Sequence, residues 1–244
     1  MKKITLNNVS KEFEFGNRSI ISVLFRLSSF ISGRRMIKKI KALDSVSFEV
    51  DSGEIVGIIG DNGSGKSTLL RVISEIYPVY TGRVDYHGKI VSLIGLGNGA
   101  INRLTMRENI FLVGSLFGLS KHEIKKKFDS IVEFSGLKDF VDTNLYKFSS
   151  GMLQRLSFSI AVHSNPDILL LDEVFEVGDE DFRKKSSDMI RGLVRKGVSV
   201  VFVSHDLDMI KKYCDRVVWL EKGKVKCIGK PKVIINKYLN HKDS

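Results

Sequence analysis

The 244-residue sequence has only two cysteines, three prolines and one tryptophan, and it has no long apolar run. Because a transmembrane helix needs about 20 apolar residues, we expect that the chain does not cross a membrane by itself. The start, residues 1–8, is charged and lacks a hydrophobic segment, which predicts no signal peptide. Cys214 and Cys227 lack the spacing of metal ligands, and we interpret them as reduced core or strand residues of a cytoplasmic protein, with a reactive thiol as the alternative.

The composition is that of a folded protein with excess positive charge. Hydrophobic residues make up 43% of the chain, enough to fill a core, and 27% of the residues are charged, which argues against disorder. The length suits one large α/β domain, or a domain with a subdomain. The net charge of +11 indicates a polyanionic partner, either nucleic acid or an anionic membrane surface.

Much of this charge lies in residues 16–43, which contain no acidic residue. The basic residues there are Arg18, Arg26, Arg34, Arg35, Lys38, Lys39 and Lys41. Within residues 20–31, apolar side chains fall on one helical face, although the segment is too short to span a bilayer. We interpret residues 16–43 as a basic amphipathic insert at the inner face of a membrane; a helix packed on its own domain is the alternative. A second basic cluster, Lys121 and residues 125–127, is interpreted as a solvated face.

Residues 60–68 match the phosphate-binding pattern G-x-x-x-x-G-K-[ST], the Walker A motif or P-loop. Its glycines let successive backbone N–H groups face an anion, and the following helix adds its positive end. Lys66 would reach the β- and γ-phosphates, and the Ser67 hydroxyl would ligate Mg²⁺. The alternative is a plain glycine-rich turn. The predicted nucleotide-binding residues are Gly60, Asp61, Asn62, Gly63, Ser64, Gly65, Lys66, Ser67 and Thr68.

Strand and helix patterns alternate along the chain around this loop. We predict strands over residues 3–15, 46–50, 54–59, 82–94, 168–171, 198–203, 217–220 and 224–228, and helical segments over about 67–75, 106–136, 151–163, 181–195 and 231–239. The runs at 168–171 and 198–203 are typical of parallel strands covered on both faces. The sequence therefore predicts an α/β core with a helical subdomain at about 100–165.

Acidic residues close one of these strands, and a histidine follows the next. Asp172 would hold Mg²⁺, and Glu173 could accept a proton from the attacking water. His205, at the end of the run 198–203, could reach the γ-phosphate. An acidic strand end or helix cap and a structural histidine are the alternatives. A P-loop upstream favours function for the two acids, and the position of the histidine one strand after them favours function for it.

A second anion site is predicted where residues 147–157 place small residues before a helix. This site cannot serve the phosphates of residues 60–68 if the two lie at opposite ends of the domain. A second copy of the chain, arranged head-to-tail, would bring them together.

With these motifs, the chain resembles the ATP-binding subunits of ABC transporters over nearly its whole length. Residues 148–152, Phe-Ser-Ser-Gly-Met, occupy the place of the family signature LSGGQ. The resemblance implies a P-loop NTPase core with an antiparallel β subdomain and a helical signature subdomain, together binding ATP and Mg²⁺. It also implies that two copies, or the chain and a relative, enclose two ATP molecules, each P-loop being closed by the partner's signature. The residues acting in this way are Ser149, Ser150, Gly151 and Met152. Phe13 would stack on adenine, and Asp179 would be the D-loop aspartate.

Residues 146–152, 166–174 and 177–179 resemble one particular branch of the family. They look like the branch that exports O-antigen, teichoic acid and capsular polysaccharides, which commonly has SSGM where other members have SGGQ and VGD where they have ALD. Residues 104–110 are similar to the LTGRENI segment of that branch.

One feature departs from the family. Most relatives have a glutamine between the P-loop and the helical arm that contacts Mg²⁺, but the only glutamine here is Gln154. Residues 93–100 stand in that place and are similar to the LGAGF loop of the polysaccharide branch. We interpret them as a coupling loop, with a flexible turn as the alternative. Their glycines do not make a dinucleotide fingerprint, because no strand-turn-helix context or ribose-binding acid accompanies them.

These patterns predict a single nucleotide-binding domain over 1–244 without a carbohydrate-binding domain at its carboxyl end. We expect an ATPase that drives export of a lipid-linked polysaccharide through a separate transmembrane permease, peripheral on the cytoplasmic face of the inner or plasma membrane. An ABC exporter of a drug, peptide or lipid is the first alternative. A soluble ABC ATPase acting on ribosomes or DNA is the second; neither paired cassettes nor a long coiled coil supports it, so we expect no nucleic-acid partner.

Overall fold

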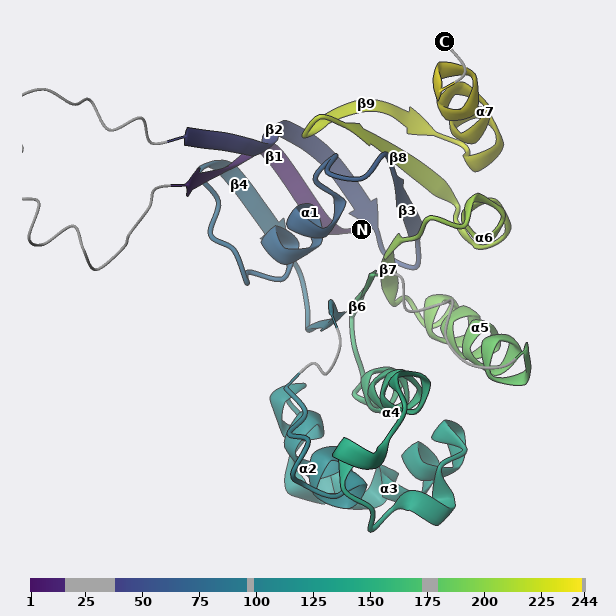
Figure 1. Ribbon diagram of the computed structural model, residues 1–244. Coiled ribbons are helices and arrows are strands. Elements are labelled where there is room, and N and C mark those ends of the chain that lie inside the picture. Colours follow the sequence, from purple (N-terminus) through teal and green to yellow (C-terminus); the bar gives the residue numbers. More distant parts are fainter. Residues whose placement is uncertain (16–37, 96–98, 173–179, 243–244) are drawn as a thin grey trace, which may run out of the picture.

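The computed structural model describes residues 1–15, 38–95, 99–172 and 180–242 (Figure 1). They form an antiparallel three-stranded sheet, a mostly parallel six-stranded sheet, and a lobe of helices at one end of the molecule. None of the helices in these ranges is long and apolar enough to cross a membrane.

The antiparallel sheet contains β1 (Lys2–Phe15), β2 (Lys38–Asp51) and β4 (Thr81–Tyr86), in the order β2-β1-β4. The pairing of β1 with β2 continues to its end, where Phe13 lies opposite Ile40 and Glu14 opposite Lys39. The predicted insert over residues 16–43 was therefore too long: residues 38–43 belong to β2, because they complete the backbone hydrogen bonds of β1. The rest of the proposed insert, residues 16–37, lies outside the described residues.

The larger sheet has the strand order β5-β6-β7-β3-β8-β9. Its strands are β3 (Ile55–Ile59), β5 (Ile90–Leu93), β6 (Ile168–Asp172), β7 (Ser199–Val203), β8 (Arg216–Glu221) and β9 (Lys224–Gly229). All neighbouring pairs are parallel except β8 with β9. The single predicted strand over 82–94 is two strands, β4 and β5, in different sheets, and His87 to Lys89 make the crossing between them.

Both faces of β6 and β7 are buried, as their continuous apolar runs predicted, whereas the edge strand β9 has exposed residues along one face. On one face, alternate residues such as Leu169 and Leu171 pack against α5 (Glu180–Arg195), α6 (Leu207–Tyr213) and α7 (Pro231–Lys242). On the other face, Ile168 and Leu170 join the core formed by α1 (Lys66–Ile73) and the antiparallel sheet. Helix α6 was not predicted, because its seven residues are too few to show a helical period.

The helical lobe contains α2 (Met106–Leu116), α3 (Lys121–Ser135) and α4 (Ser150–His163), with short 3₁₀ turns at Lys138–Phe140 and Leu145–Lys147. Helices α2 and α3 begin with capping boxes, in which Thr105 pairs with Glu108 and Ser120 with Glu123. Helix α4 joins the lobe to the core, since Leu156 and Ile160 pack within the lobe while Phe158 packs under the large sheet.

Burial in this central sheet makes a stability prediction. Leu170→Ala removes a fully buried side chain from β6 and should lower the free energy of unfolding by about 2–5 kcal/mol. The same substitution at Leu116, whose side chain is 62% exposed, should change it by less than about 0.5 kcal/mol. Urea denaturation of the two variants tests this, and equal losses would contradict the packing described.

Candidate functional site

Two positions of the P-loop turn require glycine. It leaves β3 after Ile59 and enters α1 at Lys66, with φ at +150° for Gly60 and +105° for Gly65. A Cβ on Gly60 would lie 2.2 Å from the carbonyl oxygen of Leu220, and one on Gly65 would lie 2.6 Å from that of Ala42. The loop is thus pressed against β8 and β2, and side chains at these two positions would push it away.

The turn between β8 and β9 supports the loop from behind. The Gly223 N–H donates to the Ser64 carbonyl oxygen at 3.0 Å, and the Asp44 N–H donates to the Gly223 carbonyl oxygen at 2.8 Å. The Asp44 carboxylate forms ion pairs with Lys41 and, at 3.1 Å, with Lys224. Strand β2 and this turn therefore fix the P-loop together.

The lysine of the motif is buried inside the loop. Lys66 is 7% exposed, and its Nζ donates to the carbonyl oxygens of Gly60 (2.8 Å) and Asp61 (2.9 Å). Beside it, the Ser64 Oγ is buried and forms no hydrogen bond among the residues that the structure describes. A buried ammonium and a spare hydroxyl are groups that phosphate oxygens can satisfy.

A groove of about 510 Å³ opens over the loop. Its lining residues are Ile40, Lys41, Ala42, Asn62, Gly63, Gly65, Lys66, Ser67, Thr68, His205, Lys222 and Gly223. Three of these are lysines and none is acidic, so the groove favours an anion. Its lining joins the P-loop to β2 and to the β8–β9 turn, neither of which the sequence patterns assigned to the site.

Neighbouring strands bring two more predicted residues toward the loop. Asp172 ends β6 opposite Val203 of β7, and His205 follows two residues later and lines the groove. Because β6, β7 and β3 are parallel neighbours, their carboxyl ends share one edge of the sheet with the P-loop. Glu173 and Asp179 lie outside the described residues.

The metal-binding prediction fits the donors present only if phosphate contributes. No group of three or more His, Cys, Asp or Glu side chains in the described ranges could hold a metal ion. The predicted ligands are one hydroxyl, Ser67, and one carboxylate, Asp172. Such a set suits Mg²⁺, which is commonly held by one or two carboxylates together with substrate phosphates and waters.

Phe13 lies beside the groove rather than in its lining. Its ring meets that of Tyr77 edge to face at 5.3 Å, and the Nζ of Lys11 lies 5.3 Å from the Phe13 ring centroid. Its partner across the strands, Ile40, does line the groove. Phe13 is thus one strand away from the lining, and adenine stacking on it stays a prediction.

The signature segment is at the start of α4. Ser149 is the N-cap of this helix, and its Oγ accepts a hydrogen bond from the Met152 N–H at 3.2 Å. Ser149 and Ser150 are exposed, and a Cβ on Gly151 would meet only the Ser149 Oγ, at 3.9 Å, so this positive helix end can receive an anion. Figure 1 shows α4 at the boundary of the helical lobe, with α1 on the other side of the large sheet.

The opposite end of α4 is anchored by two lysines. Lys127 of α3 donates to the carbonyl oxygen of His163 and to Asn165, and Lys89 donates to the carbonyl oxygen of Ser164 at 2.6 Å. Cations are favourable at a helix carboxyl end. Burial of the two side chains lowers the pKa of Lys89 and of Lys127.

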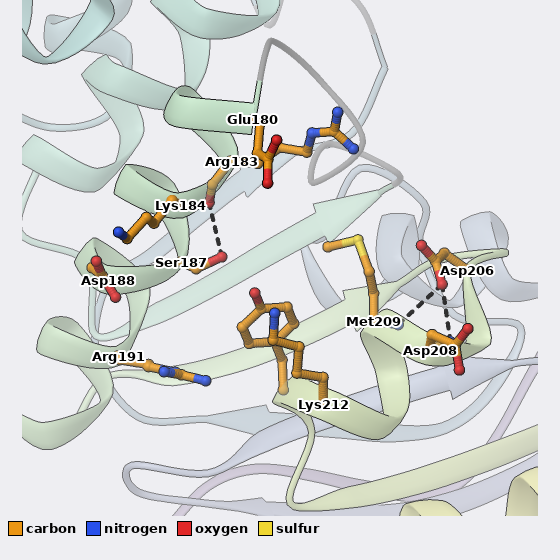
Figure 2. A pocket seen from close by; sticks show the side chains of 11 residues that line it. Glu180, Arg183, Lys184, Ser187, Asp188, Arg191, Asp206, Asp208, Met209 and Lys212 are labelled. Carbon is orange, nitrogen blue, oxygen red and sulfur yellow. Dashed lines mark hydrogen bonds between the residues drawn. The ribbon is translucent and has the colours of Figure 1, made fainter.

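A second groove, of about 760 Å³, lies between α5 and α6 (Figure 2). Its lining contains four basic residues, Arg183, Lys184, Arg191 and Lys212, and four acidic ones, Glu180, Asp188, Asp206 and Asp208. Because the charges are mixed and no phosphate loop lines it, this groove does not have the anion preference of the P-loop groove. Figure 2 shows Asp206 turned toward the start of α6, where its carboxylate accepts the N–H groups of Asp208 and Met209.

The parallel sheet, the P-loop at its edge and the acid and histidine on adjoining strands define a P-loop NTPase. The family model described as "ABC transporter" matches residues 43–176. The chain belongs to the ABC transporter family and is an ATP-hydrolysing cassette of it.

Three known proteins illustrate the similarity. The chain is 38% identical to the O-antigen export system ATP-binding protein RfbB of Klebsiella pneumoniae, over 96% of each. It is 47% identical to the teichoic acids export ATP-binding protein TagH of Lactococcus lactis, over 81% of this chain but only 42% of that longer protein. A solved dimer of an ATP-binding cassette, in a post-hydrolysis state bound to ADP and Pi, superposes with a TM-score of 0.75 at 25% identity, covering 93% of this chain and 98% of that one.

The loop geometry predicts how replacing single glycines by alanine changes the stability of the nucleotide-free protein. Ala at either Gly60 or Gly63 places a side chain at positive φ, which costs about 1–2 kcal/mol. Gly60→Ala also forces Cβ against the Leu220 carbonyl, adding about 1–3 kcal/mol, whereas nothing lies within 4 Å of a Cβ at Gly63. Urea denaturation of the nucleotide-free variants should show the larger loss for Gly60→Ala, and equal losses would refute the close packing.

The ion pairs behind the loop make a titration prediction. Hydrogen bonds from Lys41 and then Lys224 lower the pKa of Asp44 from 3.8 to about 2. A depressed acid pKa stabilises the fold fully above the ordinary value, and the contribution is lost as the pH falls through about 2. NMR titration of the Asp44 carboxyl should give this low midpoint. Lys224→Met should raise it, and a wild-type midpoint near 4 would contradict the pairing.

Proposed function

We propose that this cassette drives export of a lipid-linked polysaccharide of the O-antigen, teichoic acid or capsule type through a separate transmembrane permease. The observation that carries this proposal is the match to the Klebsiella O-antigen export protein along nearly the whole of both chains. The teichoic acid export relative supports the same class of cargo, since both names describe export of a glycan polymer of the cell envelope. The cassette would be bound peripherally at the cytoplasmic face of the inner or plasma membrane.

Each site residue has a role in this proposal that follows from its place in the sequence motifs. The N–H groups of residues 61–68 and the buried Lys66 would bind the β- and γ-phosphates, while Ser67 and Asp172 would hold Mg²⁺. When bound, Mg²⁺ supplies positive charge that neutralises the phosphates. Glu173 would accept the proton of the attacking water, and His205, at the groove, would contact the γ-phosphate.

A second copy would complete the site. The exposed start of α4 presents N–H groups and a positive helix end but belongs to a different part of the fold from the P-loop. In a head-to-tail pair, residues 149–152 of one copy would close over the nucleotide held by the P-loop of the other. The dimeric cassette among the solved structures supports the pairing of two copies.

The helical lobe offers apolar contacts for a permease. Ile101 is 48% exposed and Leu116 is 62% exposed, and a Cβ at Gly99 would lie 2.5 Å from Leu116. These side chains therefore adjoin the predicted coupling loop over residues 93–100, whose centre lies outside the described residues. Exposed apolar residues beside a predicted coupling element suit a protein partner better than free solvent.

The proposal is tested with Glu173→Gln on the native chromosome, measuring where polymer accumulates. Loss of the general base should slow ATP turnover by about 10²–10⁴-fold, while binding persists and the variant stalls as a closed dimer. Lipid-linked polymer should then build up inside the cell, leaving the surface empty. Unchanged surface polymer would reject the polysaccharide as cargo.

Lys66→Ala is the matched control. It should also stop export, but through loss of ATP binding, so size-exclusion chromatography with ATP should detect a dimer for Glu173→Gln and none for Lys66→Ala. A Glu173→Gln variant that hydrolyses ATP at the native rate would remove Glu173 from the mechanism.

A further inference from the structure

The last helix of the described chain contacts the P-loop through two side chains. The Tyr238 hydroxyl of α7 donates to Oδ1 of Asp61 at 2.8 Å. The Nζ of Lys242 forms an ion pair with the same oxygen at 3.2 Å. The two residues are four apart, so they lie on one face of the helix. We call Tyr238 and Lys242 the α7 latch.

The tyrosine of the latch is buried against the large sheet. Tyr238 is 6% exposed, and its ring packs edge to face with that of Trp219 of β8, with the ring centroids 5.4 Å apart. The Nζ of Lys242 lies 4.8 Å from the centroid of the Tyr238 ring. The aromatic ring thus fixes the hydroxyl in place, and the lysine adds a charge over it.

The residue that the latch holds organises the phosphate loop. The Asp61 carbonyl oxygen accepts the Ser64 N–H at 3.1 Å and the Lys66 ammonium at 2.9 Å. Asp61 therefore sets both the turn that aims the loop N–H groups and the position of the buried lysine. Hydrogen bonds from Tyr238 and then Lys242 lower the pKa of the Asp61 carboxyl, which keeps it charged.

Neither latch residue lines the groove over the P-loop, so neither is placed to touch a nucleotide there. Their direct contact with the P-loop is the one they make with Asp61. The carboxylate of Asp61 is 61% exposed, and without the latch it would be free to rotate in solvent. Fixing a loop in its binding conformation raises affinity by removing the cost of ordering it.

We propose that Tyr238 and Lys242 are positioning residues that hold the P-loop in its phosphate-binding conformation, so that α7 raises the affinity of this chain for ATP. The inference rests on the proposed nucleotide site. It assigns to the carboxyl-terminal helix a role in setting the KM for ATP. The chemical step depends on other residues, so kcat should change little.

The test is calorimetric titration of the full chain with a non-hydrolysable ATP analogue, together with an ATPase assay. Tyr238→Phe keeps the ring against Trp219 but removes the O–H donor, and it should raise the Kd about two- to tenfold. Lys242→Met should act in the same direction. The KM for ATP should rise in parallel, with the melting temperature of the nucleotide-free protein nearly unchanged.

The control is Lys237→Met, which removes an exposed lysine from the same helix and should leave the Kd at the wild-type value. In an Asp61→Ala background, Tyr238→Phe should have no further effect, because the latch acts only through that carboxylate. An unchanged Kd for Tyr238→Phe, or an equal rise in the Asp61→Ala background, would overturn the inference. A wild-type chain that binds no nucleotide would reject the proposed nucleotide site itself. A wild-type chain that binds nucleotide no more tightly than the Tyr238→Phe variant does would reject only the role of the latch.

Discussion

The close packing of the P-loop against two carbonyl oxygens is the constraint on which this structure depends. Gly60 lies against Leu220 of β8, and Gly65 lies against Ala42 of β2. These contacts join three strands from distant parts of the chain at one point: β3, which enters the loop, β8 beside it, and β2 from the other sheet. The antiparallel sheet is therefore part of the P-loop groove, since its strand β2 supports the loop and lines the groove.

Around the P-loop, lysines line the groove, and nearby acids outside its lining are paired with lysines. The lining of the groove carries three lysines and no acid, while two acids outside the lining form ion pairs, Asp44 with Lys41 and Lys224, and Asp61 with Lys242 of the α7 latch. The charges of these two acids are thus compensated by nearby lysines. The groove keeps the positive potential that a triphosphate needs.

Helix α4 shows how one element can serve two parts of the fold. Its start is exposed and able to receive an anion, its sides pack into both the lobe and the core, and its end is fixed by Lys89 and Lys127. Lys89 belongs to the core and Lys127 to the lobe. The anchoring of the end of α4 therefore depends on how the lobe is oriented relative to the core. A movement of the lobe relative to the sheet would therefore carry the signature segment with it.

The sequence alone determined the class of the protein, because local patterns encode it. The P-loop spacing, the apolar runs of β6 and β7 and the N-cap of α4 each depend on residues close together in the chain. Only the tertiary structure decided what surrounds the loop. Lys41 looked like part of a basic insert until β2 was seen to begin at Lys38, and no pattern connects Tyr238 with Asp61, which are 177 positions apart. Such contacts depend on the path of the whole chain, whereas phosphate-binding motifs depend on backbone geometry that a few consecutive residues can specify.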